Sequence, residues 1–470
     1  MLCLEHMTRS DGMNIWINKC IEDEVTEGFG HPYIFNITNK GNSTIKSDIK
    51  DIWFDLGSVQ IDSIYEDLYI IALTVFAIDK RFPRQDSSDR WTRQFNVSIP
   101  VVHAAQWNRV KDEWEKVLRF LSGDIWNISF RKTGYRYCKN TTKTPQLQVK
   151  NEYDCLCLFS GGLDSYCGAI KLLEEGKSVC FIGYKEYPKL AKRQGELFDI
   201  LRKNYPDIPK KILRFTATPR APFLDQKIQN MSENTSRSRS LLFICGALSI
   251  ANILGDNIPL FIPENGFIGL NIPLTSSRKG SCSTRTTHPY FIKGLENILS
   301  AVGINNKINN FYAFSSKTDV VNSVKDTSAL MEGVEKTISC SHPCLPRWSK
   351  NDSREYPLNC GYCYPCLIRK SSVRHLNLSN DKYTELISTS AEFLNRYTDF
   401  AGKASDTRAV LTMVYKYKDM SDDKLKRIIR CNGNLSALEV DKFLNVYKNS
   451  IKDLIDLVSE VPGMKEYLEL

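Results

Sequence analysis

From residue 153 onward, short apolar runs alternate with segments in which apolar residues recur every three or four positions. Short apolar runs bounded by turn residues predict buried strands, and the three-to-four spacing predicts helices. Alternating strands and helices are typical of a parallel sheet with helices on both faces, which binds ligands beyond the carboxyl ends of its strands. The expected strands are 153–159, 178–184, 212–216, 258–262 and 311–314, and the expected helices are 166–175, 189–203, 238–254 and 289–302.

The region before residue 150 has a different pattern. A helix with one apolar face at 64–80, a strand at 94–102 and an amphipathic helix from Trp107 to Leu121 predict a mixed α/β domain. A polar stretch rich in threonine and lysine follows and predicts a linker. One expected loop holds four arginines: Arg81, Arg84, Arg90 and Arg93. The favoured interpretation is that solvent surrounds this loop, and the alternative is that it binds an anion.

The last hundred residues are helical in pattern. Ser436 and Glu439 have the spacing of a capping box. The apolar residues that follow, from Val440 to Val458, recur at helical spacing and predict a packing face.

Composition restricts the class of protein. The chain has 470 residues, of which 42% are hydrophobic and 25% are charged, as in ordinary globular proteins. The net charge of +9, from 63 Lys and Arg and 54 Asp and Glu, is spread along the chain, so a nucleic-acid partner is possible but not favoured. The longest apolar runs are too short to span a bilayer, and residues 1–20 do not have the pattern of a signal peptide. We therefore expect a cytoplasmic protein without a membrane partner.

One motif has the composition of a phosphate-binding loop. Ser160, Gly161, Gly162, Leu163, Asp164 and Ser165 lie between the first strand of the α/β region and its helix. Two glycines allow the backbone to turn sharply and to present N–H groups to a phosphate, and the helix N-terminus adds positive potential. The alternative is a glycine turn with a helix cap.

A second motif has the spacing of a metal site. Cys360, Cys363 and Cys366 lie close together, and Cys340 lies twenty residues upstream. Four thiolates form a closed tetrahedral Zn²⁺ site, which stabilises structure and leaves no position for catalysis. Cys344 and His342 are alternatives to Cys340 as the remote ligand. Two further interpretations of the four cysteines are an iron–sulfur cluster and reduced cysteines without a metal.

Together these patterns predict four segments. They are an N-terminal mixed α/β accessory domain at 1–145, an α/β domain at 146–335, a zinc-binding segment with four cysteines at 336–375 and a helical C-terminal extension at 376–470.

The Ser-Gly-Gly-x-Asp-Ser loop resembles the PP-loop of the ATP pyrophosphatases. Combined with Thr337-Ile338-Ser339-Cys340 and the segment from Cys360 to Arg369, it resembles the 7-cyano-7-deazaguanine synthase (QueC) family over about residues 152–375. The resemblance implies a doubly wound parallel sheet of the adenine nucleotide alpha hydrolase type, with ATP, Mg²⁺ and Zn²⁺ as cofactors. It also implies ATP-dependent activation of a 7-deazaguanine carboxylate and formation of an amide or nitrile, the activity of a carbon–nitrogen ligase.

The resemblance assigns roles to particular residues. Residues 160–165 are expected to bind the nucleotide, and Asp164, Ser165, Arg239 and Lys317 are the candidate catalytic residues. Positive side chains have to offset the negative charge that develops during activation of the carboxylate. The candidates are Arg239, Arg285 and Lys317. The alternative for each is that it is an ordinary surface residue. The candidate substrate contacts are Ser238, Arg239, Glu264, Asn265, Asn271, Arg285 and Thr286.

The added N- and C-terminal regions and the segment 264–289 are more similar to QueC-like proteins of the QatC type, which belong to anti-phage defence systems. That similarity implies a partner protein from the same operon, with a protein amine in place of ammonia. Two alternatives remain: a tRNA-modifying PP-loop enzyme, and a non-catalytic scaffold that binds nucleotide.

Overall fold

The computed structural model describes most of the chain. The described residues are 12–20, 24–26, 29–37, 45–57, 61–138, 151–233, 237–273, 285–341, 343–344, 356–376, 378, 383, 390–396, 403–461 and 463–470. The expected linker at 139–145 and the candidate ligand His342 lie outside them. Within these residues, no helix is both long and apolar enough to cross a membrane.

The chain folds into two compact units, each built from several segments. Unit 1 comprises Met1–Asn151, Phe215–Ile258 and Phe291–Lys307. Unit 2 comprises Glu152–Arg214, Pro259–Tyr290 and Ile308–Leu470. The sequence placed 215–258 and 291–307 in the α/β domain at 146–335, whereas in the structure they group with the N-terminal region. The expected extension at 376–470 belongs to unit 2.

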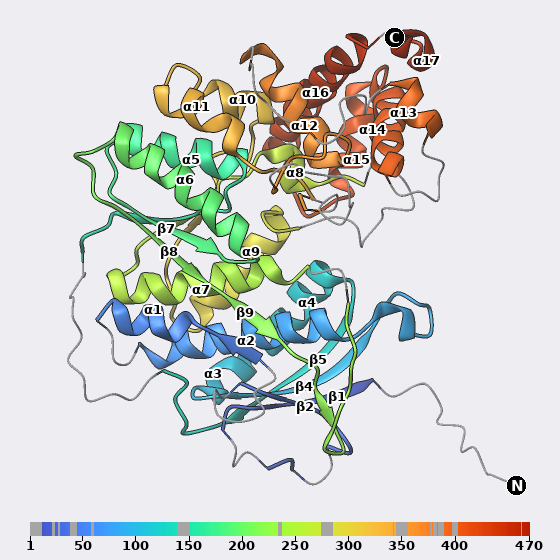
Figure 1. Ribbon diagram of the computed structural model, residues 1–470. Coiled ribbons are helices and arrows are strands. Elements are labelled where there is room, and N and C mark those ends of the chain that lie inside the picture. The colour runs from blue at the N-terminus through green and yellow to red at the C-terminus, as the bar shows by residue number, and fades with distance from the viewer. Residues whose placement is uncertain are drawn as a thin grey trace, which may run out of the picture. The chain divides into compact units, whose positions relative to one another are not determined.

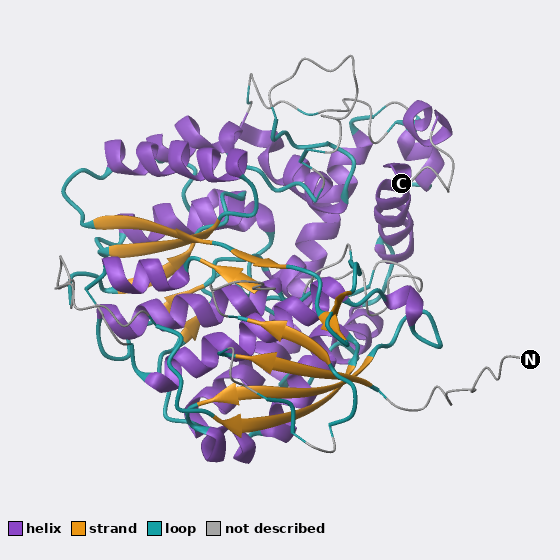
Figure 2. Ribbon diagram, turned by 60° about the horizontal axis from the view of Figure 1, so that its bottom comes forward, coloured by secondary structure: helices purple, strands orange, loops and turns teal. Residues whose placement is uncertain are grey.

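Unit 1 contains a six-stranded sheet with the order β11-β10-β2-β1-β4-β5 (Figure 2). Strand β1 pairs in parallel with both β2 and β4, and β4 pairs in parallel with β5, whereas β10 runs antiparallel to β2. A separate antiparallel pair joins β3 and β9. The strands are β1 (Met13–Asn18), β2 (Tyr33–Asn36), β3 (Ile45–Ser47), β4 (Gln94–Val101), β5 (Ile125–Lys132), β9 (Ala217–Pro219), β10 (Phe223–Leu224) and β11 (Lys227–Ile228).

The helices of unit 1 lie close to their predicted positions, but the helix expected at 64–80 is buried on nearly all sides and not only on the predicted apolar face. Helix α2 (Ser63–Arg81) begins where Asp62 accepts a hydrogen bond from the backbone N of Ile64, and α7 (Arg239–Leu254) packs beside it (Figure 1). Both helices are buried on nearly all sides, and together they form one core from residues that are far apart in the sequence. The amphipathic segment after residue 104 forms two helices instead of one. The others are α1 (Ile49–Asp55), α3 (Ala104–Arg109), α4 (Lys111–Ser122) and most of α9 (Pro289–Ala301).

The arginine-rich segment at 81–93 is only in part the solvated loop that its charge predicted: residues 85, 86 and 88–91, Arg90 among them, are exposed, and Arg81 is half-buried. Arg84 and Arg93 are buried and form ion pairs with the buried carboxylates of Asp79 and Asp124. The prediction was wrong for these two arginines because their partners lie on other elements, where sequence proximity gives no signal.

Unit 2 contains a five-stranded sheet with the order β13-β12-β6-β7-β8. Strand β6, the first along the chain, lies in the middle, and the pairs that join β13, β12, β6 and β7 are parallel. The strand order therefore reverses at β6, which is where open α/β sheets bind ligands. The strands are β6 (Cys155–Leu158), β7 (Val179–Tyr184), β8 (Lys210–Phe215), β12 (Leu260–Phe261) and β13 (Ile308–Asn309). The strand expected at 311–314 is instead a turn, because pairing with β12 ends at Asn309.

Helices α5 (Leu163–Glu174) and α6 (Pro188–Asn204) lie on one face of this sheet (Figure 1). The other helices of unit 2 are α8 (Gly266–Leu270), α10 (Lys317–Asn322), α11 (Ser328–Gly333), α12 (Tyr364–Val373), α13 (Ala391–Arg396), α14 (Lys403–Tyr417), α15 (Asp422–Arg430), α16 (Ala437–Ser459) and α17 (Met464–Leu468). The capping box of Ser436 and Glu439 at the start of α16 is confirmed.

Helix α16 supports the elements that follow β12 and β13. The ring of Tyr447 packs on Phe267 of α8 at 4.8 Å between centroids, and its hydroxyl donates to the Phe267 carbonyl. Thr318 of α10 donates to Asp453 of α16 at 2.6 Å. The C-terminal helices therefore hold both α8 and α10 in place.

Candidate nucleotide and metal sites

The loop 160–165 joins the carboxyl end of β6 to the N-terminus of α5. Gly161 has a φ of +85°, which favours glycine, and Gly162 is the N-cap residue of α5. The Ser160 hydroxyl accepts from the backbone N of Gly162 at 3.2 Å and lies 3.1 Å from the Ser165 hydroxyl. Ser165 donates in turn to the Gly162 carbonyl at 2.9 Å. The loop is a compact turn whose hydroxyls and backbone are fixed by one another.

The segment with the sequence Thr-Ile-Ser-Cys lies against this turn. The backbone N of Ile338 donates to the Gly161 carbonyl at 2.9 Å. Asn359 accepts from the backbone N of Ser339 at 3.0 Å and donates to the Thr337 carbonyl at 3.1 Å. Two motifs that are more than 170 residues apart in the sequence therefore meet at the carboxyl end of β6.

Two other predicted site residues, Lys317 and Asn265, meet at Asp164. The ammonium of Lys317, in the first turn of α10, lies 2.7 Å from Oδ1 of Asp164. Asn265 donates to Oδ2 from its side-chain amide at 2.7 Å and from its backbone N at 3.3 Å. Both charged side chains are almost fully buried. The carboxylate of Asp164 is therefore held in one orientation by donors from the loops after β12 and β13.

Glu264 lies next to Asn265 on the chain. Its carboxylate accepts a hydrogen bond from Thr287, and its backbone N and carbonyl are both bound by Asn310. Burial, and to a smaller extent the charge of Asp164, raise the pKa of Glu264 to about 7, against the hydrogen bond from Thr287 and the charge of Lys317. A carboxyl group that titrates near neutral pH is suited to accept or donate a proton.

The other predicted substrate residues of unit 2 lie around the same loops. Asn271 ends α8 in a left-handed conformation. Arg285 and Thr286 are half-buried, and burial lowers the pKa of Arg285. His288 is buried, which lowers its pKa to about 4, so it is neutral at physiological pH.

Ser238 and Arg239 belong to unit 1. The hydroxyl and backbone N of Ser238 both donate to Oδ2 of Asp79, at 2.8 and 3.0 Å, and the side chain is fully buried. Its two donors are therefore committed to Asp79 of α2, and its side chain makes no capping hydrogen bond to α7. Arg239 is the first residue of that helix and is half-buried.

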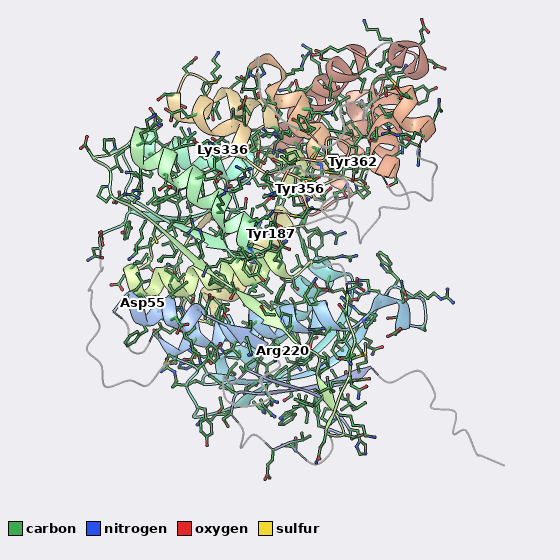
Figure 3. The ribbon with its side chains drawn as sticks, in the orientation of Figure 1. Asp55, Tyr187, Arg220, Lys336, Tyr356 and Tyr362 are labelled. Carbon is green, nitrogen blue, oxygen red and sulfur yellow. The ribbon has the colours of Figure 1, made fainter. Side chains whose placement is uncertain are left out.

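The four predicted cysteines form one cluster. The sulfurs of Cys340, Cys360, Cys363 and Cys366 lie within 4.8 Å of one another, and two of the pairs are 3.9 Å apart. The backbone N of Cys360 donates to the Cys340 sulfur, and that of Cys363 to the Cys360 sulfur, both at 3.3 Å. Tyr356 and Tyr362, labelled in Figure 3, are buried on either side of Cys360 along the chain.

This geometry fits a tetrahedral metal. Four sulfurs at about 2.3 Å from one zinc ion would lie about 3.8 Å apart, close to the observed 3.9 Å. Mutual hydrogen bonds between the thiols lower the pKa of Cys363 and raise that of Cys340. Cys360, Cys363 and Cys366 are buried and Cys340 is half-buried, and four thiolates so close together would need a cation, so the cluster can hold a metal such as zinc. Cys344, the alternative ligand, is outside this group.

Gln194, Asn310 and Asn359 gave no signal in the sequence, whereas Arg369 ends the cysteine-containing segment that carries the resemblance. Gln194 of α6 is buried and donates to the carbonyls of Ser160 and Tyr184, at 3.2 and 3.4 Å. Arg369 of α12 is buried and donates to the Thr337 hydroxyl at 2.7 Å. Asn310 bonds to the backbone of Glu264, and Asn359 bonds to the backbone of Thr337 and Ser339. Gln194, Asn310 and Asn359 are isolated polar residues that belong to no sequence motif, and their roles are evident only from their hydrogen bonds in the structure.

The fold and the sites define a mixed α/β protein with parallel sheets and a four-cysteine cluster. Comparison of the chain with protein-family models gives no match, and comparison with curated proteins gives no match either.

Proposed function

We propose that this protein is a QueC-like, ATP-dependent carbon–nitrogen ligase with a PP-loop fold, which activates the carboxylate of a 7-deazaguanine and joins it to an amine. The observation that carries the proposal is the loop 160–165 at the strand-order reversal, with Asp164 fixed by Lys317 and Asn265.

The loop is suited to a polyphosphate for three reasons. Gly161 has the positive φ that a sharp turn needs, α5 points its N-terminus at the turn, and two serine hydroxyls flank it. Residues 160–165 would bind the phosphates of ATP, and Asp164 would be a ligand of Mg²⁺. Oδ1 of Asp164 has a second lone pair beyond the one that Lys317 uses, whereas Oδ2 already accepts two hydrogen bonds from Asn265. Bound ATP would supply the adenylyl group, with loss of pyrophosphate, that turns a carboxylate oxygen into part of a leaving group.

The surrounding side chains suit a carboxylate substrate. Lys317 offers a buried positive charge close to the loop, and such a charge offsets negative charge that develops as an acyl adenylate forms. Glu264, with a pKa of about 7, can exchange a proton with an attacking amine near neutral pH. Arg285 and Thr286 would contact the substrate beyond these two groups.

The metal cluster has a structural role in this proposal. Zn²⁺ bound by Cys340, Cys360, Cys363 and Cys366 would fix residues 337–340, which lie against Gly161. A site closed by four thiolates has no free position for substrate.

We further propose that the amine belongs to a partner protein, as in defence systems of the QatC type. The regions outside 152–375, which the synthases lack, would serve that partner. The resemblance of the motifs and of the added regions supports this part of the proposal.

The test is incubation of the protein with ATP, Mg²⁺ and 7-carboxy-7-deazaguanine, with and without the product of a neighbouring gene. Release of AMP and a mass increase of one deazaguanine on the partner are expected. Asp164→Asn should abolish both, whereas the matched variant Asp154→Asn, at an exposed aspartate before β6, should retain both. Absence of nucleotide turnover with every partner would favour the scaffold. A salt-sensitive complex with bulk tRNA would favour the tRNA-modifying enzyme.

A further inference from the structure

Unit 1 contains a cluster of five charged side chains that the proposed function does not use. Its members are all buried: Asp79, Arg84, Arg93, Asp124 and Arg237. Arg93 lies 2.7 Å from Asp79 and 2.6 Å from Asp124, and Arg84 lies 2.8 Å from Asp124. Asp79 also accepts from the backbone N of Arg237 at 2.8 Å. The cluster joins α2, β4, the start of β5 and the start of α7.

The hydrogen bonds of the three arginines are unequal. Arg93 uses every nitrogen of its guanidinium, on Asp79, Asp124 and the Phe82 carbonyl. Arg237 uses only Nη1, which donates to the Ser122 carbonyl. Its Nε and Nη2 are buried and have no hydrogen-bond partner in the structure as described, and the same holds for Nε of Arg84. A buried donor without a partner costs free energy, so this arrangement needs an explanation.

The charges of the cluster do not balance either. Three guanidinium groups face two carboxylates, which leaves one positive charge in excess. Glu233 is half-buried and accepts from the backbone N of Arg84. Burial, followed by repulsion from Arg84, lowers the pKa of Arg237 to about 10, although Asp79 and Asp124 oppose the shift. The side chain is still charged at neutral pH.

The two free nitrogens of Arg237 form one edge of its guanidinium. The Nε–Nη2 edge is the one that binds two oxygens of a phosphate or carboxylate in parallel. Nε of Arg84 is a further buried donor of the cluster without a hydrogen-bond partner. A tetrahedral anion has oxygens in more than one plane, so it can accept from Arg84 as well as from Arg237. The unused donors therefore call for an oxyanion, while the half-buried carboxylate of Glu233 at Arg84 offsets part of the positive charge of the cluster.

Trp91 packs on this cluster and is itself partly exposed to solvent. Its ring lies over the guanidinium of Arg237 at 5.3 Å and over that of Arg84 at 5.6 Å, and it is 38% exposed. Its backbone N is held by Asp89, and residues 88–91 are all exposed. A ligand can therefore approach Arg237 when one half-exposed side chain moves.

We propose that Arg237 and Arg84 form a binding site for a phosphate group beneath Trp91, separate from the loop 160–165. The phosphate accepts the Nε and Nη2 hydrogens of Arg237 and neutralises the remaining positive charge of the cluster. The ligand class is a phosphate monoester or inorganic phosphate. Unit 1 therefore binds a phosphate group at a site that does not include the loop 160–165 of unit 2.

The test uses the full-length protein and inorganic phosphate as the probe, with chloride at equal ionic strength as the reference. Phosphate should raise the midpoint of thermal unfolding above that in chloride, since a ligand that binds only the folded state stabilises it. It should also change the tryptophan fluorescence. Trp91→Phe should abolish the fluorescence change and leave the thermal shift.

Two substitutions locate the binding. Arg237→Met should abolish the thermal shift, and Arg237→Lys, which keeps the charge without the two-donor edge, should weaken phosphate binding at least tenfold. Arg202→Met, at an exposed arginine of α6, is the matched control and should respond like the native protein. A native protein that responds equally to phosphate and chloride would overturn the proposal, and so would an undiminished shift in Arg237→Lys.

Discussion

Lys317 places its ammonium 2.7 Å from Oδ1 of Asp164, and both side chains are nearly excluded from solvent. They are 153 residues apart in the sequence. Their meeting depends on the capping box of Ser316 and Asp319, which starts α10, and on the bond between Thr318 and Asp453, which ties α10 to α16. The C-terminal helices thus contribute to the geometry of a loop that lies far from them in the sequence.

Removing one member of this pair should destabilise the fold more than removing both. Lys317→Met leaves a buried carboxylate without its cation and is expected to lower the free energy of unfolding by about 3 kcal/mol. The double variant Asp164→Asn with Lys317→Met should recover most of this loss. Urea denaturation measures both, and additive losses in the double variant would show that the two side chains do not interact.

The glycine at position 161 should be required for nucleotide binding as well as for stability. An alanine with positive φ costs about 1 kcal/mol, so Gly161→Ala and Gly176→Ala, whose φ values are +85° and +74°, should lose similar stability. Only Gly161→Ala alters the turn at the end of β6 and should weaken ATP binding at least tenfold by calorimetry. Equal ATP affinity in the two variants would argue against this loop as the phosphate site.

The purified protein should contain one zinc ion per chain. Cys340→Ser and Cys363→Ser are expected to lose the metal, because each removes one of four ligands, and the unfolding midpoint should fall with it. Cys344→Ser is the matched control, since this cysteine lies near the cluster but outside its four ligands. Elemental analysis by mass spectrometry measures the zinc. Loss of zinc in Cys344→Ser alone would assign the fourth position to that residue.

Glu264 should make stability depend on pH. Its pKa rises on folding from an ordinary 4.5 to about 7, so between these values the native state holds a proton that the unfolded chain releases. The free energy of unfolding should therefore fall as pH rises from 4.5 to 7, by roughly 2 kcal/mol after allowance for partial exposure.

Glu264→Gln isolates that contribution. His288, with a pKa lowered to about 4, produces a rise in stability with pH between 4 and 6.5, but it does so in both proteins. The difference between the native protein and Glu264→Gln in urea denaturation should thus follow Glu264 alone. Parallel pH profiles in the two proteins would place the carboxyl pKa near its ordinary value.

Local patterns predicted local structure well. The apolar spacing located α2, α5, α6 and α7 to within a few residues, and the cysteine spacing identified all four members of the cluster. Lys317 and Asn265 were named as site residues, although the sequence gave no indication that both bind Asp164. The arginines at 84 and 93 were misread because their partners, Asp79 and Asp124, come from other elements. The composition of the two units also escaped prediction, since the pairing of α7 with α2 depends on packing between remote segments.

Transfer of oxygen from the substrate to the nucleotide tests the central claim most directly. The protein would be incubated with ATP, Mg²⁺, its partner and 7-carboxy-7-deazaguanine labelled with ¹⁸O in the carboxylate. If the loop at Gly161 holds ATP for attack by that carboxylate on the α-phosphate, the AMP released will carry ¹⁸O by mass spectrometry. Formation of AMP without the label would contradict carboxylate activation.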